Sequence, residues 1–373
     1  MGFLLSLHKP NRVYLQIMKS IYSIFISLIL LSGCANIVAP LGGEKDSDPP
    51  EILNTTILEK EGTTEINFTF NEYIQINKWE EYFYISPPTE KRIRKKIKGK
   101  KLTITIEDTL AKRTTYNIVL NNCVKDNNEG NILDSLFTIL PTSDKIDSLT
   151  LSGKLQDAYT LTEVENAWVM LFEENRADSI IFKEKPNYIA KTNKNGDFYF
   201  PNLNNKNYNI VSITDFDFIY NEGEKMAFMN TLVNAERDSF IALLSFDPII
   251  VIDNLLKDST IIEVDSIAAD SLIIDEVNYG TLNIINQKNK RCIFQLLQNN
   301  KVINEFKFTE EPFLLTKIIP GNYKLKYIDD RNRDGKWTTG SWIKRIQAEQ
   351  VVNYPSEIII RYNWNLELEW ELK

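Results

Sequence analysis

Histidine is almost absent from this sequence, since His8 is the single imidazole among 373 residues. It lies inside a leader that we expect to be removed, so the mature chain would contain no histidine. This excludes the Ser-His and Cys-His pairs of hydrolases and zinc sites with histidine ligands. The sequence also has no Gly-Lys-Ser/Thr phosphate loop and no Gly-x-Ser-x-Gly elbow, and no spacing marks out a pair among its 51 acidic residues. We therefore predict that the protein is not an enzyme.

Cysteine is also scarce, with three residues in the whole chain. Cys34 follows the leader directly. The other two, Cys123 and Cys292, lie far apart in segments that we assign to different domains. We interpret them as two separate buried thiols, and a disulfide between them is the alternative.

The chain has no apolar run of about 20 residues, the length that a membrane-spanning helix needs. Its N-terminal apolar stretch, Ile21–Leu31, follows Lys19 and ends in Leu31-Ser32-Gly33-Cys34. A positive charge, a short apolar run and a small-residue cleavage site occur here in the order typical of a secretory signal peptide. The last four residues resemble a bacterial lipobox, which implies cleavage after Gly33 and attachment of a diacylglyceryl lipid to the Cys34 thiol. The alternative is a short buried helix that ends in cysteine.

The leader and the segment behind it set the first boundaries. Residues 1–33 are predicted to be the signal peptide, and Met18 is the expected start because residues 1–17 precede an already complete signal. Residues 34–50 are small, polar and proline-ended, which is typical of a flexible tether. No Asp follows Cys34 directly, which favours the outer membrane, and no acidic run follows it, which favours the periplasmic face over the cell surface.

Acidic residues outnumber basic ones. Removal of residues 1–33 takes away Lys9, Arg12 and Lys19 but no acid, which moves the formal charge from -8 to -11. Because an acidic chain binds polyanions poorly, we expect no nucleic-acid partner. Lys91–Lys101, by contrast, contains eight basic residues in eleven. We interpret it as a solvated hairpin whose charges discourage strand pairing; if it is functional, its partner would be lipopolysaccharide, phospholipid headgroups or an acidic protein.

Alternating apolar and polar residues indicate half-buried strands in residues 51–142. The pattern occurs at residues 65–70 and 101–106, and further short strands are expected at residues 116–120 and 137–140. The segment resembles the SbsA-type bacterial Ig-like domain in its motifs Asn71-Glu-Tyr73, Ser86-Pro-Pro88, the basic hairpin closed at Gly99, Thr115-Tyr116 and Asp126-Asn-Asn-Glu-Gly130. This resemblance implies a sandwich of seven strands with a spacer or adhesion role and no catalysis.

A second set of strand patterns occupies residues 148–250. Strands are expected at residues 149–155 and 167–172, and Lys191–Phe200 is predicted to form a tight hairpin in which Asn195-Gly196 supplies the positive φ. The segment resembles the carboxypeptidase regulatory-like family in the order Gly153, Asp157, Ala167-Trp-Val169, Thr192, Gly196-Asp-Phe198, Leu203 and Tyr208. The resemblance implies a non-catalytic, transthyretin-like sandwich.

The C-terminal part of the chain repeats this pattern. Residues 201–215 align with residues 318–329, each with a turn, a tyrosine, an alternating strand and an acidic loop. An internal duplication explains the match, so residues 278–373 are predicted to be a second transthyretin-like sandwich. Residues 251–277 are acidic with recurring Asp-Ser pairs, and we interpret them as a linker. The alternating residues 362–370 indicate a closing strand whose apolar face packs in the core.

One loop has the beginning of a calcium motif. Asp330, Asn332 and Asp334 supply side-chain oxygens at alternate positions, and a glycine and the carbonyl of Lys336 follow, as in the first half of an EF-hand loop. Ser341 stands where a bidentate Glu would be expected, so any calcium binding would be weak. The interpretation that we favour is a hydrogen-bonded, Asx-rich loop that needs no metal, and no other cofactor is expected.

Tryptophan is the residue through which the chain could bind sugars by stacking. Trp168 and Trp364 lie in strand patterns that predict burial in a core. Trp79 and Trp342 are the remaining candidates for a sugar-binding surface.

Together these patterns predict an all-β protein with three tandem β-sandwich domains, one Ig-like and two transthyretin-like (prealbumin-like), behind a lipoprotein signal peptide. The whole mature chain resembles a widespread Ig-like lipoprotein of Bacteroidota envelopes. We expect a non-catalytic protein, anchored in the membrane through the lipid on Cys34, that acts as a spacer or protein-interaction module at the outer membrane with an envelope protein as partner. The alternative is a carbohydrate-binding lipoprotein of a glycan-uptake system.

Overall fold

The computed structural model of the chain describes residues 12–30, 45–60, 62–174, 178–214, 218–221, 223–248, 279–285, 291–308 and 313–370. Two compact units are formed by residues 1–48 and 49–373. The described part of the first unit contains the helix α1 (Arg12–Leu30). Within the ranges given above, no helix has the length and hydropathy needed to cross a membrane.

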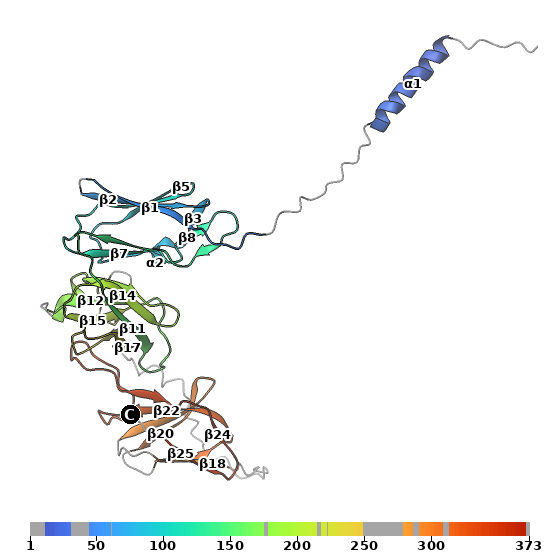
Figure 1. Cartoon of the computed structure of the whole chain (residues 1–373). Coiled ribbons are helices and arrows are strands. Elements are labelled where there is room, and N and C mark those ends of the chain that lie inside the picture. The colour runs from blue at the N-terminus through green and yellow to red at the C-terminus, as the bar shows by residue number, and fades with distance from the viewer. Residues whose placement is uncertain are drawn as a thin grey trace, which may run out of the picture. The chain divides into compact units, whose positions relative to one another are not determined.

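The first part of the second unit is a β-sandwich (Figure 1). One sheet has the order β1-β2-β6-β5, a second has the order β10-β7-β4, and a small third sheet has the order β3-β8-β9. The resemblance to an Ig-like domain implied seven strands, whereas the described residues 45–60 and 62–142 form ten, because several short strands lie between the longer ones. A helical turn, α2 (Trp79–Tyr82), also lies among them. The strands are β1 (Ile52–Lys60), β2 (Thr63–Phe70), β3 (Ile74–Ile76), β4 (Tyr84–Ser86), β5 (Arg94–Lys98), β6 (Lys101–Ile106), β7 (Thr115–Val119), β8 (Val124–Asp126), β9 (Ile132–Leu133) and β10 (Phe137–Pro141).

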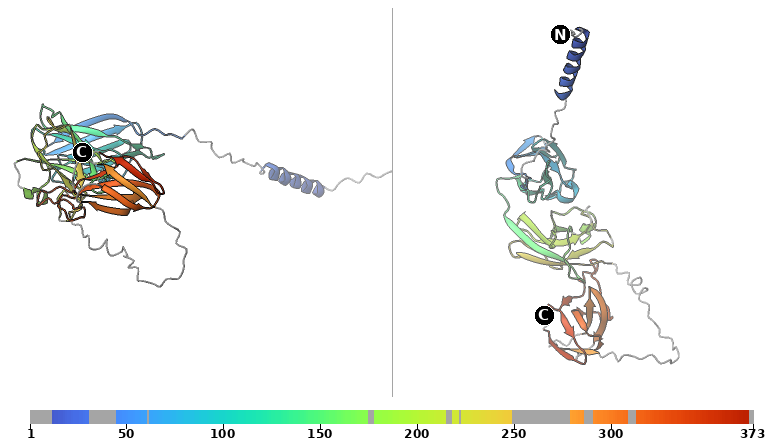
Figure 2. Two further views of the ribbon diagram at one scale, coloured as in Figure 1. Left: turned by 90° about the horizontal axis from the view of Figure 1, so that it is seen from below. Right: turned by 90° about the vertical axis from the view of Figure 1, so that its right-hand side faces the viewer.

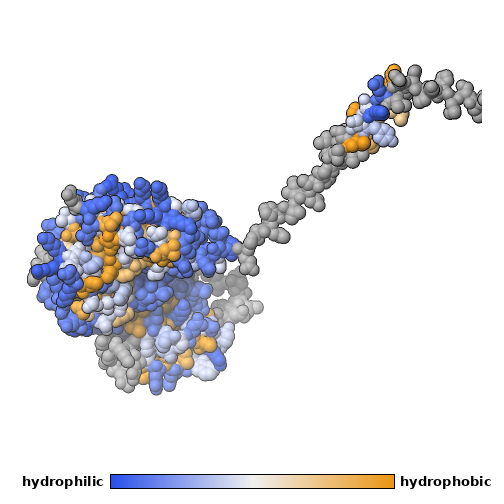
Figure 3. All heavy atoms as spheres, turned by 45° about the horizontal axis from the view of Figure 1, so that its top comes forward, coloured by the Kyte–Doolittle hydropathy of each residue, from blue (hydrophilic) through white to orange (hydrophobic). Residues whose placement is uncertain are grey.

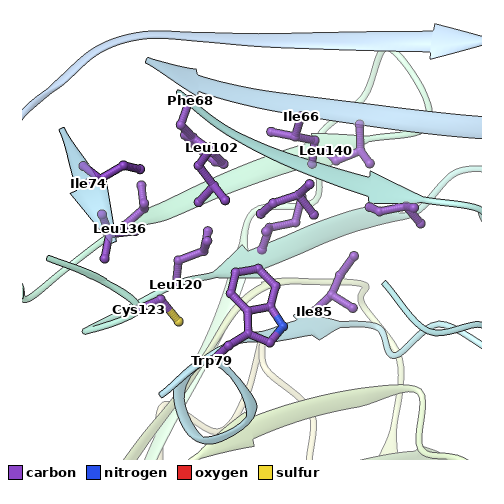
Figure 4. Close-up of a cluster of buried hydrophobic side chains, with 14 of the residues drawn as sticks. Ile66, Phe68, Ile74, Trp79, Ile85, Leu102, Leu120, Cys123, Leu136 and Leu140 are labelled. Carbon is purple, nitrogen blue, oxygen red and sulfur yellow. The ribbon is translucent and has the colours of Figure 1, made fainter. Parts of the chain in front are cut away.

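The core of this sandwich is formed by the alternate residues that the sequence marks as inward-facing. Phe68 of β2 and Leu102 of β6 are fully buried, as expected from period-two alternation. Figure 4 shows Trp79 beside Ile85 and Leu120 in the same cluster. The predicted strands in this segment are therefore confirmed, and β6 has the predicted bounds.

Strand β1 lies at the edge of a sheet that has a buried face, yet all of the residues of β1 are exposed. Ile52, Leu53, Ile57 and Leu58 are among the exposed large hydrophobic side chains. On the face of the molecule drawn in Figure 3, hydrophobic patches lie among mostly hydrophilic residues. The opposite edge strand of the sheet, β5, instead carries four basic residues, which discourage pairing with another strand.

The second sandwich has one sheet with the order β14-β11-β17 and another with the order β13-β12-β15-β16. Its core lies between them and includes Leu151 of β11 and Leu171 of β12. The elements are β11 (Leu149–Asp157), β12 (Trp168–Glu173), a short 3-10 helix (Asp178–Phe182), β13 (Tyr188–Lys191), β14 (Asp197–Leu203), β15 (Tyr208–Ile213), β16 (Met226–Phe228) and β17 (Phe240–Ser245).

The predicted hairpin over Lys191–Phe200 is wrong. Strand β13 pairs with β12, whereas β14 pairs with β11 in the other sheet. Gly196 does adopt the expected positive φ, at +74°. The turn therefore has the chemistry of a hairpin but carries the chain from one sheet to the other.

The third sandwich repeats the strand order of the second. Its sheets have the orders β21-β18-β25 and β20-β19-β22-β23, and β24 also pairs with β22. In both sandwiches the first described strand pairs antiparallel with the fourth and parallel with the last. The strands of the third sandwich are drawn in orange and red in Figure 2. The strands are β18 (Gly280–Ile285), β19 (Cys292–Gln298), β20 (Lys301–Phe308), β21 (Phe313–Ile318), β22 (Gly321–Asp329), β23 (Val351–Asn353), β24 (Ile358–Ile360) and β25 (Asn365–Glu369).

The duplicated tyrosines occupy equivalent positions in the two sandwiches. Tyr208 lies at the start of β15, and its hydroxyl donates to the backbone oxygen of Asn204 at 3.2 Å. Tyr323, near the start of β22, donates in the same way to the oxygen of Ile319 at 2.7 Å. Each hydroxyl thus holds the turn that precedes its strand. The internal repeat in the sequence therefore corresponds to two sandwiches that have the same strand order and the same tyrosine contact in a turn.

Two further predictions concern side chains in these sandwiches. Cys123 and Cys292 are free and buried, so the interpretation as separate thiols is confirmed. The prediction that the tail packs wholly in the core is wrong for Tyr362 and Trp364, which are 68% and 52% exposed. Both residues precede β25, whereas Trp370 at its end packs in the third core.

Candidate functional site

The calcium-like loop after β22 is held by its own hydrogen bonds. The two carboxylate oxygens of Asp330 accept the N–H groups of Asp334 at 3.1 Å and Gly335 at 3.0 Å. Asn332 donates from Nδ2 to Asp334 Oδ2 at 2.9 Å, and Asp334 Oδ1 accepts the N–H of Lys336 at 2.8 Å. The structure therefore brings Asp330, Asn332 and Asp334 together, as the sequence predicts. Lys336 contacts the loop through its backbone N–H, whereas the calcium motif would use its carbonyl.

Glu349 belongs to the same loop although sequence reasoning missed it. Its Oε1 accepts the N–H groups of Arg331 at 2.8 Å and Asn332 at 3.2 Å, and its Oε2 accepts the N–H of Thr338 at 2.9 Å. Glu349 is 6% exposed. Burial raises its pKa, the three N–H groups oppose that change, and the charge of Asp330 adds to the increase. No motif signals this residue, because it reaches the loop only through the fold.

This arrangement favours a structural role for the loop. In the described ranges, no group of three His, Cys, Asp or Glu side chains is placed to hold a metal ion. Calcium normally takes six to eight oxygen ligands, and the carboxylates here already accept N–H groups of the loop. The same device occurs in the first sandwich, where Asp126 accepts the N–H groups of residues 128–131. Weak calcium binding by Asp330 and its neighbours stays a hypothesis for experiment.

The basic segment forms the predicted hairpin. β5 and β6 pair through Lys98 and Lys101, and Gly99 between them has a φ of +63°. Its positive charges are partly neutralised, since Arg92 and Lys95 each lie 3.5 Å from Glu80. All β5 side chains except Ile97 are exposed. The geometry is that of a charged, solvated sheet edge.

Neither tryptophan proposed for sugar stacking presents an open ring. Trp79 is 6% exposed; it stacks on Phe83 with ring centroids 4.0 Å apart, and Lys95 Nζ lies 4.6 Å from its ring centroid. Trp342 is also 6% exposed, and the guanidinium of Arg345 lies 3.5 Å from its ring centroid. Both residues contribute to packing, so they do not form a sugar platform.

Polar contacts join the first sandwich to the second. Ser86 accepts the N–H of Ile189, and Lys191 Nζ donates to the backbone oxygen of Glu81 at 2.5 Å. Burial lowers the pKa of Lys191, while Glu81 and other negative charges oppose that change. Lys191 also lies over the ring of Trp168, which is buried as the sequence predicts.

The junction between the second and third sandwiches uses the same kind of contact. Lys326 Nζ donates to the backbone oxygen of Tyr159 at 2.8 Å and lies 4.1 Å from its ring centroid. The hydroxyl of Tyr159 donates to Gln295 Oε1 at 3.1 Å. Trp342 packs with Phe228 of β16 in one buried cluster. This junction therefore combines aromatic contacts with a lysine bound to a main-chain oxygen.

Two of the sequence-based predictions lie outside the described residues. These are the lipidation site Cys34 with the signal peptide cleavage site, and the acidic linker at residues 251–277.

Comparison with solved structures gives matches of low sequence identity and low TM-score. Fervidolysin from Fervidobacterium pennivorans, a keratinolytic enzyme related to subtilisin, is 11% identical and has a TM-score of 0.21. The match covers 51% of this chain and 26% of fervidolysin. Native alpha-2-macroglobulin from Escherichia coli, spanning domains MG0-NIE-MG1, is 11% identical over 82% of this chain and 96% of its own, with a TM-score of 0.21. BcpA, the major pilin subunit of Bacillus cereus, is 10% identical over 52% of this chain and 70% of its own, with a TM-score of 0.18. The chain thus spans about a quarter of the length of fervidolysin.

The search of curated proteins gave no match. The family comparison gave a match for the first sandwich, where residues 46–142 fit the model of the bacterial Ig-like domain. This range contains β1 to β10 and their common core. The chain therefore contains a bacterial Ig-like domain at residues 46–142, followed by further β-sandwich structure.

Proposed function

We propose that this protein is a non-catalytic, lipid-anchored cell-envelope protein whose β-sandwiches act as a spacer or protein-interaction module at the outer membrane, with a second envelope protein as partner. Its anchor would be a lipid on Cys34, followed by the tether at residues 34–50, and the periplasmic face is the favoured side. We also propose that the second and third sandwiches are transthyretin-like domains and that the second is a carboxypeptidase regulatory-like domain.

The observation that carries the spacer role is the pair of hydrogen-bonded junctions. A spacer must resist bending between its domains, and domains joined by few contacts move freely. Here Lys191 and Lys326 each bind a main-chain oxygen of the neighbouring sandwich, and Lys326 also lies over the ring of Tyr159 in that sandwich. These contacts favour a fixed arrangement of neighbouring sandwiches over a string of independent ones.

The anchor is tested by Cys34→Ala. We expect the variant to incorporate no labelled palmitate and to leave the membrane fraction, because alanine has no thiol to which the lipid could be attached. Cys292→Ala is the matched control, since that thiol is buried in the third sandwich and should not change either readout. A Cys34→Ala protein that stays in the membrane fraction would overturn the lipid anchor.

The side of the membrane and the partner need separate measurements. Protease treatment of intact cells should leave the protein whole if it faces the periplasm. Crosslinking in native membranes, followed by affinity capture, should recover a second envelope protein. Robust turnover of peptidoglycan or polysaccharide by the purified chain would overturn the non-catalytic role.

A further inference from the structure

A groove of about 840 Å³ lies where the first sandwich meets the sheet β14-β11-β17 of the second. Its floor includes Ser152, Tyr199 and Phe240, and residues of the first sandwich, among them Asn121 and Phe137, form a wall. The floor residues point away from the core, because their neighbours along each strand are the buried ones.

The floor has two exposed aromatic rings set in a row. Ser152 of β11 is the register partner of Tyr199 on one side and of Phe240 on the other. Neighbouring strands lie about 4.8 Å apart, so the two aromatic residues are separated by about 10 Å across the sheet. Tyr199 is 54% exposed and Phe240 is 61% exposed. Unlike Trp79 and Trp342, both rings are thus open to a ligand.

The polar groups around these rings are mostly uncharged. Hydroxyl and amide side chains such as Ser135 and Asn121 line the wall, and the charged lining residues are one base, Lys191, and one acid, Asp197. Asn121 is held in place, since its Oδ1 accepts the N–H of Leu136 at 3.1 Å. The lining therefore has no net charge, which gives no advantage to an anionic ligand.

We propose that this groove binds a neutral oligosaccharide. A sugar ring presents a face of C–H groups, which packs on aromatic rings, and a rim of hydroxyls, which exchange hydrogen bonds with amides and hydroxyls. Tyr199 and Phe240 supply two stacking surfaces in one row, and the wall supplies the neutral polar groups. This binding is separate from the spacer role and does not depend on the lipid anchor.

The test is calorimetric titration of the full chain in detergent with cellohexaose, xylohexaose, maltohexaose, laminarihexaose and chitohexaose, and with hexagalacturonate as the anionic comparison. We expect binding of at least one neutral oligosaccharide with an affinity that salt does not change. The double variant Tyr199→Ala/Phe240→Ala should weaken that binding by about tenfold or more, because it removes both stacking surfaces.

Tyr362→Ala is the matched control, because Tyr362 is an equally exposed aromatic residue of the third sandwich and should leave the affinity unchanged. All three substitutions are at exposed positions, so the thermal unfolding of each variant should match that of the original chain. The proposal is overturned by three outcomes: no binding of any neutral oligosaccharide, binding that the double variant retains, or stronger, salt-sensitive binding of hexagalacturonate. None of these outcomes bears on palmitate incorporation, so the groove and the anchor are tested independently.

Discussion

The hydroxyl oxygen of Ser86 accepts a hydrogen bond from the backbone N–H of Ile189 at 3.0 Å, and both residues are buried. Ser86 ends β4 in the first sandwich, and Ile189 lies in β13, an edge strand of the second. Edge strands have main-chain groups without a partner in their own sheet. In this protein, one sandwich supplies the partner that the edge of the next sandwich lacks.

Ser86→Ala should therefore destabilise the chain. The substitution leaves the buried N–H of Ile189 without its acceptor, which costs about 2 kcal/mol. Urea unfolding of the full chain measures this loss. Ser143→Ala is the control, because that hydroxyl makes an exposed contact with the oxygen of Lys145, and its effect should be close to zero. Equal stability of the two variants would show that the junction contact contributes nothing.

Asp126 should make the first sandwich sensitive to acid. Burial raises its pKa, but four backbone N–H groups outweigh burial and hold the pKa below the ordinary value of 3.8. The folded state therefore binds this proton less readily than the unfolded state. The stabilisation is complete above the unfolded pKa and is lost as pH falls through the folded pKa.

Asp126→Asn removes this titration. We expect the variant to be less stable by about 2 kcal/mol at neutral pH and to lose less stability than the original chain on acidification below about pH 4. Chemical unfolding at a series of pH values provides the measurement. Asp134→Asn, which changes an exposed acid of the same segment, is the control and should leave the stability at neutral pH close to that of the original chain. If the Asp126→Asn variant lost as much stability on acidification as the original chain, Asp126 would not be the group that makes the sandwich sensitive to acid.

Gly153 cannot accept a side chain. An added Cβ would lie 2.2 Å from the backbone oxygen of Ile241 and 2.2 Å from Cζ of Phe198. Because the first of these is main chain of the adjacent strand β17, we expect Gly153→Ala to destabilise the chain by about 3 kcal/mol. Thermal unfolding measures the effect, and Thr150→Ala at an exposed position of β11 should stay within about 0.5 kcal/mol of the original chain.

Calcium should not stabilise the chain through the loop at Asp330. Addition of millimolar calcium is expected to leave the melting temperature unchanged, and Asp334→Ala should lower the stability by about 1 kcal/mol through the loss of loop hydrogen bonds. A melting temperature that rises with calcium concentration in the original chain, but not in the variant, would instead identify a cation site.

Sequence alternation predicts a strand well where one side of it is buried. The alternation in residues 101–106 predicts a strand, and these residues form β6 with the same bounds, because Leu102 and its inward-facing neighbours meet the opposite sheet. The connection at Gly196 shows the limit of local signals. A positive φ suits a hairpin and a crossing between sheets equally, and only the long-range pairing of β14 with β11 distinguishes them.

The sequence predicts the strands better than it predicts which side chains are buried and what they contact. Trp364 continues the alternation of β25 but lies one residue before that strand, so its ring is left in solvent. Glu349 shows the same difficulty in the candidate site, since its contacts with Arg331 and Thr338 come from loop packing and follow no sequence spacing. The groove at Tyr199 and Phe240 depends on strand register, which alternation alone does not determine.

The parallel pairing of the first and last strands has a consequence for synthesis. β11 leaves the ribosome almost a whole sandwich ahead of β17, and β18 is separated from β25 in the same way. During that interval each first strand has an open edge that a strand from another nascent chain could occupy. Such contacts between distant segments also slow folding. A chaperone that shields nascent strands would act on this protein mainly before β17 and β25 are complete.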